Sequence, residues 1–147
     1  MISRPYQLMI VAFCLLTPIL AIEVRTQNRQ WLSYEPAVVE LEGELTVEPK
    51  YGPPNYGENP KTDAKVRVPI LRLSTSVNVR GTPGDGFNAN SVREAKRIQL
   101  LFRPGASYDQ FIGKKVRVKG TLFHAFSGHH YTKVVMDVRV INDASEK

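Results

Sequence analysis

A strict alternation of apolar and polar residues between Val39 and Glu48 constrains the fold of this chain more than any other feature. Every second residue is apolar or glycine, and the residues between them are four glutamates and one threonine. A period of two is typical of a β-strand with one buried face. Gly43 at the centre of the stretch predicts a bulge or a sharp bend, as a strand needs when it turns across a small barrel.

Four further stretches alternate in the same way and are predicted to be strands. They cover residues 66–73, 96–102, 114–123 and 131–141. In the first of them the alternation changes phase after Ile70. Pro69 stands next to the change, which predicts a bulge or a sheet edge, because proline cannot donate a hydrogen bond to a neighbouring strand.

The connections between these stretches contain the residues that break regular structure. Residues 74–94 are rich in glycine and proline and predict an irregular segment, in which Val77 and Val79 could add a short strand. Ser107 and Gln110 have the spacing of a helix capping box, so a short helix is expected over residues 107–112.

Three strands, a short helix and a closing hairpin follow one another in the five-stranded oligonucleotide/oligosaccharide-binding (OB) Greek-key barrel. We therefore expect an all-β fold with one short helix, and a small β-sandwich is the alternative. In the barrel the first strand pairs with the fourth, which would place opposite charges across from one another: Glu40, Glu42 and Glu44 on the outer side of the first strand, and Arg117 and Lys119 on that of the fourth. The basic run at 114–119 is then a weaker indication of nucleic-acid binding, since part of its charge has a partner.

The first 21 residues have the layout of an export signal, with Arg4 as the only charge before an apolar run at residues 8–16. That run is shorter than the roughly 20 residues needed to cross a bilayer. We expect cleavage after Ala21, and an uncleaved N-terminal anchor is the alternative. Cys14, the only cysteine, lies in this segment, so the mature chain would have no disulfide.

The predicted organisation is therefore a signal peptide at 1–21, a lead-in at 22–36, one barrel domain at 37–142 and a frayed tail at 143–147. The expected location is the bacterial periplasm or the cell exterior, with no membrane span after signal removal. The formal charge of +6 allows an acidic partner but does not require one.

The 50–63 loop and the tip of the last hairpin are the two candidate functional segments. The loop contains three prolines, two glycines and the aromatic residues Tyr51 and Tyr56. Long ordered loops often carry function, although a connection that is stiffened by proline and packed by its tyrosines fits equally well.

The hairpin tip holds all three histidines of the chain. Pairing without a bulge requires residue numbers that differ by an even amount, which predicts His124 opposite His130 and Phe123 opposite Tyr131. His129 would lie in the loop between them. Neutral imidazoles could bind zinc, although a hydrogen-bonded tip that stiffens the hairpin is the interpretation we favour.

The same hairpin resembles a known family. The motifs are GTLFHA at residues 120–125, GHH at 128–130 and Thr132, followed by the alternating strand; Tyr108, Gly113, Lys114, residues 98–100 and the 52–58 loop fit as well. They resemble an uncharacterised family of small exported bacterial proteins, a domain of unknown function. Family members often carry histidine at the positions of Phe126 and Tyr131, so the histidine cluster here is smaller. The resemblance implies a bacterial origin, export and a compact β domain, and it implies no activity.

These observations favour an exported, non-catalytic binding domain for an unidentified envelope protein or saccharide. Nucleic acid is not the expected partner, because the export signal would direct the protein out of the cytoplasm, where nucleic acid is found. One alternative is a metal-dependent hydrolase centred on His124, His129 and His130, and another is an inhibitor or immunity-type partner of an exported enzyme. The candidate ligand-binding residues are Tyr51, Tyr56, Phe123, His124, Phe126, His129, His130 and Tyr131.

Overall fold

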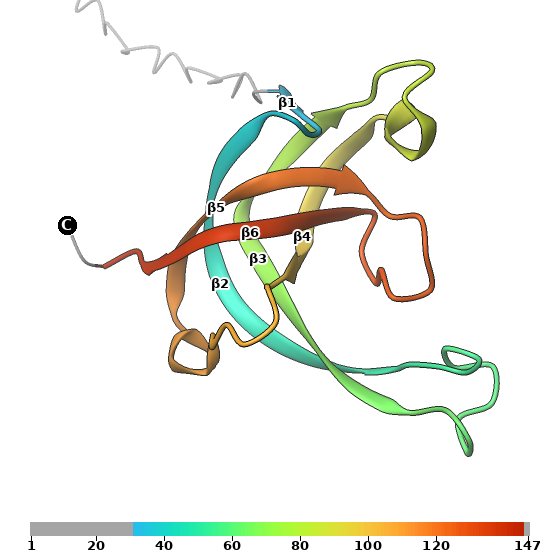
Figure 1. Cartoon of the computed structure of the whole chain (residues 1–147). Helices are drawn as coiled ribbons and strands as arrows, with labels where there is room; N and C mark the ends of the chain where they lie inside the picture. Colours follow the sequence, from blue (N-terminus) through green and yellow to red (C-terminus); the bar gives the residue numbers. More distant parts are fainter. Residues whose placement is uncertain (1–30, 146–147) are drawn as a thin grey trace, which may run out of the picture.

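The computed structural model in Figure 1 describes residues 31–145 of the 147-residue chain. The predicted export signal at residues 1–21 and the first part of the predicted lead-in lie outside the described residues. Within the described range, no helix has the length and apolar character that crossing a membrane would require.

The described chain is all-β, which confirms the predicted class. The predicted helix at 107–112 is a single 3-10 turn. Its N-cap residue is Tyr108, which makes no side-chain capping hydrogen bond, so the capping-box prediction is wrong. The elements in chain order are β1 (Trp31–Ser33), β2 (Val38–Tyr51), β3 (Lys65–Arg80), η1 (Gly86–Ala89), β4 (Val92–Leu101), η2 (Asp109–Phe111), β5 (Lys115–His124) and β6 (Val134–Asp143).

All six strands form one mixed sheet that closes on itself. The strands follow one another in the order β1-β3-β2-β5-β6-β4, and β4 also pairs with β3. The β4–β6 and β1–β3 pairs are parallel, and the others are antiparallel. Figure 1 shows the strands wrapped around a common interior, while the far end of the β2–β3 hairpin projects away from the rest of the sheet.

The interior of the closed sheet is filled by the apolar residues of the alternating pattern. Each side chain of this kind contributes about 1.5–3 kcal/mol when it is fully buried. The fully buried members include Leu45, Leu71, Ile98, Val116, Val118, Leu122, Val134 and Met136. Apolar burial inside the sheet is therefore the main source of the stability of this fold.

The far half of β6 departs from the predicted inward face. The register between β5 and β6 shifts between Lys119 and Gly120, so that Lys119 pairs with Val140 while Gly120 pairs with Val138. The extra residue on β6 reverses the alternation. Val140 is consequently exposed and Ile141 packs against the core in its place, so the prediction for Val140 is wrong.

Gly43 lies where β2 pairs with β3 on one side and with β5 on the other, opposite Leu73 and Val116. Neither pairing has a register shift at this point, so the predicted bulge is absent. A Cβ atom at residue 43 would lie 2.4 Å from the carbonyl oxygen of Arg72. Glycine is required here because the neighbouring backbone approaches too closely for any side chain.

The predicted pairing of opposite charges on the outer side of β2 and β5 is confirmed. Glu40 pairs with Lys119 and Glu42 with Arg117 in the strand register. The guanidinium group of Arg117 forms ion pairs with both glutamates, at 3.4 and 3.3 Å, and Lys115 forms another with Glu42. These groups are exposed, so each pair adds little stability.

β3 is longer than the sequence indicated. It continues to Arg80, so residues 74–80 are strand and not the start of an irregular segment. The register with β4 shifts on both sides of Val77, not at the phase change after Ile70. Pro69 pairs with β2 alone, because pairing with β4 begins at Ile70, and its position at an edge is as predicted.

The closing hairpin has a longer loop than predicted. Phe123 pairs with Val135 and His124 with Val134, so the predicted pairing of His124 with His130 and of Phe123 with Tyr131 is wrong. The loop covers residues 125–133. The numbers of the paired residues still differ by an even amount, as predicted. Hydrogen bonds to Gln99 of β4, however, keep residues 129–132 out of the pairing between β5 and β6.

Candidate functional site

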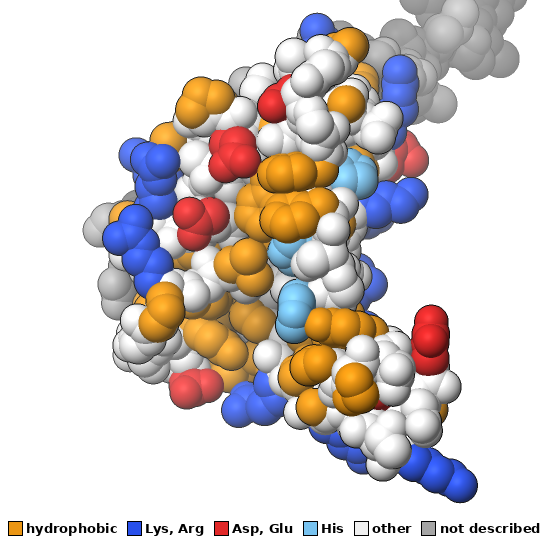
Figure 2. All heavy atoms as spheres, turned by 45° about the vertical axis from the view of Figure 1, so that its right-hand side comes forward, with side chains coloured by type: hydrophobic (Ala, Val, Ile, Leu, Met, Phe, Trp, Pro, Cys, Tyr) orange, Lys and Arg blue, Asp and Glu red, His pale blue; other side chains and the backbone are white. Residues whose placement is uncertain are grey.

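Three loops meet on one side of the closed sheet: residues 52–64 between β2 and β3, residues 81–91 around η1, and residues 125–133 between β5 and β6. Figure 2 shows this side, where the pale blue histidine side chains lie beside a cluster of orange hydrophobic ones. The molecular outline is hollowed where the projecting β2–β3 hairpin leaves the body.

Gln99 holds the 125–133 loop in place. Its side-chain nitrogen donates to the carbonyl oxygen of His129 at 2.9 Å, and its side-chain oxygen accepts from the backbone N–H of Tyr131. The backbone N–H of Gln99 donates to the hydroxyl of Thr132 at 2.9 Å. Gln99 is only 4% exposed, so these hydrogen bonds satisfy polar groups that would otherwise be buried without partners.

Gln99 belongs to a row of residues on the outer side of the sheet that the 125–133 loop covers. Ile70, Gln99, Val135 and Phe123 are neighbours across β3, β4, β6 and β5. All four are buried although they alternate with the core residues and face away from the interior. The 125–133 loop folds back over this row, as its hydrogen bonds to Gln99 require.

Asp63 organises the 52–64 loop. Its carboxylate accepts hydrogen bonds from the backbone N–H groups of Asn55, Gly57 and Asn59, and one from the side chain of Asn55. Burial by itself raises the pKa of Asp63, but these hydrogen bonds outweigh that effect and hold the pKa below its ordinary value. The loop is therefore ordered around an ionised carboxylate.

The 52–64 and 125–133 loops contact each other through their aromatic residues. The hydroxyl of Tyr56 lies 2.8 Å from Nε2 of His129, and the Tyr131 hydroxyl donates to the carbonyl oxygen of Tyr51 at 2.8 Å.

Tyr56 has a positive φ of 53°. Such a conformation costs about 1–3 kcal/mol in a non-glycine residue and tends to occur at functional positions.

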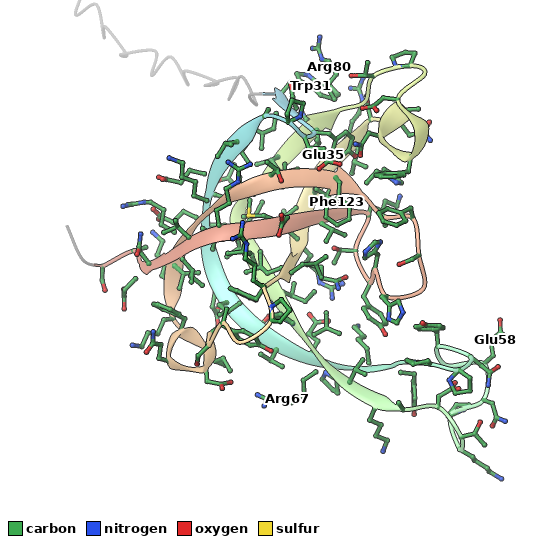
Figure 3. All side chains as sticks on the ribbon, in the orientation of Figure 1. Trp31, Glu35, Glu58, Arg67, Arg80 and Phe123 are labelled. Atoms are coloured by element: carbon green, nitrogen blue, oxygen red, sulfur yellow. The ribbon has the colours of Figure 1, made fainter. Side chains whose placement is uncertain are left out.

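An exposed aromatic cluster lies at the other end of the 125–133 loop. The rings of Phe87 and Phe126 stack with their centres 4.2 Å apart, and they are 44% and 57% exposed. The imidazole of His130 stands edge-on to Phe126 at 4.6 Å and to Phe123 at 5.2 Å. Phe87 comes from η1, so segments far apart in the sequence build one apolar surface; Phe123, also labelled in Figure 3, forms its buried base.

His130 is held as a neutral imidazole. Its Nδ1 accepts a hydrogen bond from the backbone N–H of Phe126 at 3.1 Å and lies 3.3 Å from the hydroxyl of Ser127. Burial lowers the pKa of His130 below its ordinary value, and the nearby His129 lowers the pKa further.

His124 lies apart from the other two histidines in its interactions. Its Nδ1 donates to the carbonyl oxygen of Ala125 at 2.9 Å, and its backbone N–H donates to the side chain of Asn88. The ring of Tyr34 stands edge-on to it at 6.2 Å. Tyr34 is buried, its hydroxyl has no hydrogen-bond partner among the described residues, and burial raises its pKa to about 12.

Each of the three imidazoles therefore has its own hydrogen-bond partner. Within residues 31–145, no group of three histidine, cysteine, aspartate or glutamate side chains is arranged to hold a metal ion. A zinc site on His124, His129 and His130 stays a prediction, and metal analysis of the purified protein is its test.

The structure places the eight predicted ligand-binding residues along the contact between the loops, with Tyr51 and Tyr56 at one end and Phe126 at the other. Sequence reasoning missed Phe87, Asn88 and Gln99. The available signal for Gln99 was a single polar residue between Ile98 and Leu100, but its position in the alternation indicated solvent. Nothing in the sequence alone indicated that a loop would cover it.

Comparison with known proteins relates part of this chain to a protein family. The family model described as Domain of unknown function (DUF4431) matches residues 97–142. This segment holds Gln99, β5, the 125–133 loop and most of β6, whereas the 52–58 loop lies outside it. Neither curated proteins nor solved structures yield a significant match. The resemblance to an uncharacterised family is thus confirmed: over residues 97–142, this chain matches a domain of unknown function, DUF4431.

Proposed function

We propose that this protein is a non-catalytic saccharide-binding domain built on an OB-type Greek-key barrel. The closed pairing of β2, β3, β4, β6 and β5 supports the barrel, as does the parallel contact between its third and fifth strands. In this fold the loops between strands one and two and between strands four and five flank the ligand. Here they are the 52–64 and 125–133 loops.

The observation that carries the proposal is the exposed pair of stacked rings, Phe87 and Phe126. Exposed apolar surface costs solubility and marks interaction sites when it is clustered. The flat, apolar faces of sugar rings pack on aromatic rings of this kind, while loop hydroxyls and imidazoles can bond the sugar hydroxyls. Tyr56 and His129 provide such groups at the neighbouring contact.

We also propose that the chain is exported and acts in the cell envelope, since its first 21 residues have the composition of a signal peptide. N-terminal sequencing of the protein recovered from the envelope tests this. A mature chain that begins at Ile22 is the expected result, and recovery of the full-length chain in the cytoplasm would contradict it.

The binding proposal is tested by calorimetric titration with a neutral hexasaccharide of N-acetylglucosamine. Phe126→Ala should weaken binding about tenfold, because losing an aromatic contact of this size costs on the order of 1–2 kcal/mol. Val140→Ala is the matched control, since Val140 is an exposed apolar residue at the far end of β6. Equal affinity of Phe126→Ala and the wild type would refute the proposed binding surface.

A further inference from the structure

A second surface, away from the aromatic cluster, carries a concentration of positive charge. A cleft of about 570 Å³ lies over the outer side of β2, β3 and β4. Four of the six residues that line it are basic and one is acidic: Lys50, Arg72, Lys96, Arg97 and Glu48, with Leu73 as the sixth. Unlike the outer side of β2 and β5, where charges alternate in sign, this surface has a clear positive excess.

The centre of the cleft is an arrangement that the fold by itself does not favour. Arg72 and Arg97 lie directly opposite each other in the register of β3 and β4. Like charges at directly opposed positions destabilise a sheet. Such a local conflict is expected where a protein maintains a binding site at a cost in stability.

Glu48 offsets part of this repulsion. Its carboxylate forms ion pairs with Arg72 and Lys50 at 3.1 Å each, and a shorter one with Arg97. Burial by itself raises the pKa of Glu48, but the hydrogen bonds from Lys50 and Arg72 and the charge of Arg97 hold it below its ordinary value. The cleft therefore already holds one carboxylate between two guanidinium groups.

Further donors remain for a second anion. Each guanidinium has five N–H groups. Arg72 and Arg97 each contact Glu48 through one terminal nitrogen, and their side chains are 55% and 44% exposed. A carboxylate that approaches from solvent can accept hydrogen bonds from the guanidinium groups of both Arg72 and Arg97, in the bidentate geometry that arginine favours.

A neighbouring cleft of about 390 Å³ extends the basic surface along β4. It shares Lys96 and Arg97 with the first cleft and adds Arg93 and Lys133, with Glu94 as its one acidic residue, so the positive excess continues. Its other end is lined by Tyr131 and Thr132 of the 125–133 loop. Because the two clefts share two residues, they adjoin each other, and this arrangement suits a chain molecule better than a single small ion.

We propose that the two clefts form one basic groove that binds a carboxylate-bearing polysaccharide. The inference rests on the proposed saccharide binding and adds the charge of the ligand. A single-stranded nucleic acid fits less well, because its binding requires aromatic rings on which bases stack. Tyr131 is the one aromatic residue lining the two clefts, and its hydroxyl is engaged with Tyr51.

The test is calorimetric titration of the full mature chain with an oligogalacturonate of six residues and with its methyl-esterified form, which has the same sugar chain without the charge. The acidic form should bind and the esterified form should bind much more weakly. Arg97→Gln and Arg72→Gln should each weaken binding of the acidic form about tenfold or more, as expected for the loss of hydrogen bonds between charged groups. Glu48→Gln should strengthen binding severalfold, because it removes the carboxylate that occupies the arginines.

Matched controls exist on β2 and β5. Glu42→Gln and Arg117→Gln make the same changes of charge in an ion-paired cluster outside the groove, and they should leave the affinity unchanged. Unfolding midpoints of all variants, measured in parallel, identify any loss of folded protein.

The outcomes separate the groove from the aromatic surface. Equal binding of both oligosaccharides, no effect of Arg97→Gln, or no binding of the acidic form at all would overturn the groove. Tighter binding of a six-residue oligothymidylate than of the oligogalacturonate would overturn it in favour of nucleic acid. Loss of oligogalacturonate binding in Arg97→Gln together with full binding in Phe126→Ala would support the groove, whereas the aromatic surface stands or falls with the neutral hexasaccharide.

Discussion

Replacement of Gln99 by leucine provides a direct test of how the 125–133 loop is held. Leucine has a similar volume but cannot bond the carbonyl oxygen of His129 or the N–H of Tyr131. Each buried polar group that is left without a partner costs about 1–3 kcal/mol. Because His129 and Tyr131 are near the surface and can turn towards water, we expect a total loss of about 2 kcal/mol in the free energy of unfolding.

Urea unfolding, followed by fluorescence, measures this loss as a lower midpoint. The dependence of the free energy of unfolding on urea concentration should stay unchanged, since the same surface is exposed on unfolding. Hydrogen exchange at the amide of Tyr131 should accelerate as well, because its acceptor is gone. Gln110→Leu is the control, as Gln110 is exposed and has no such role, and its effect should stay within about 0.5 kcal/mol. If Gln99→Leu matched the control in stability and in exchange at Tyr131, the reasoning would be refuted.

Three further predictions concern a closely packed glycine, the pH dependence of stability and the order of the 52–64 loop. Gly120→Ala should destabilise the fold by about 3 kcal/mol in urea unfolding, because its Cβ would lie 2.1 Å from the carbonyl oxygen of Asp137; a loss below about 0.5 kcal/mol would contradict this close approach. The pKa of His130 is lower in the folded protein than its ordinary value of 6.5. The neutral imidazole therefore stabilises the folded state fully above pH 6.5, and this stabilisation is lost as the pH falls through the folded-state pKa. His130→Asn should flatten unfolding free energy against pH below 6.5, and an unchanged profile would argue against a neutral His130. Asp63→Asn should speed proteolysis within the 52–64 loop, since three backbone N–H groups lose their charged acceptor, and an unchanged cleavage rate would show that the loop is held by other contacts.

Local patterns were sufficient to locate the five longer strands, and opposite charges agreed with one long-range pairing. Alternation placed β5 within one residue and β2 within three residues of their observed limits, and the charges of Glu42 and Arg117 matched across the two strands. It failed at Val140, because a bulge reverses the side-chain direction and leaves no mark in the composition of the strand. The same pattern could not reveal that β3 continues through residues 74–80.

The candidate site was only partly predictable. The histidines and tyrosines were visible in the sequence, yet their partners depend on loops that meet only after the sheet has closed. Phe87 stacks on Phe126 across 39 positions of sequence, and Gln99 reaches the 125–133 loop from another strand. Their neighbours in sequence carry no information about these contacts.

The sequence by itself determined the all-β class, the inward faces of most strands and the resemblance to an uncharacterised family, since a period of two is a local property of the chain. Tertiary structure alone decided the length of the closing loop, the burial of Gln99 and the side-by-side position of Arg72 and Arg97. Strand register and loop packing depend on contacts between distant segments. They are set by the closed sheet as a whole, through the burial of apolar surface and the hydrogen bonds that each buried polar group requires.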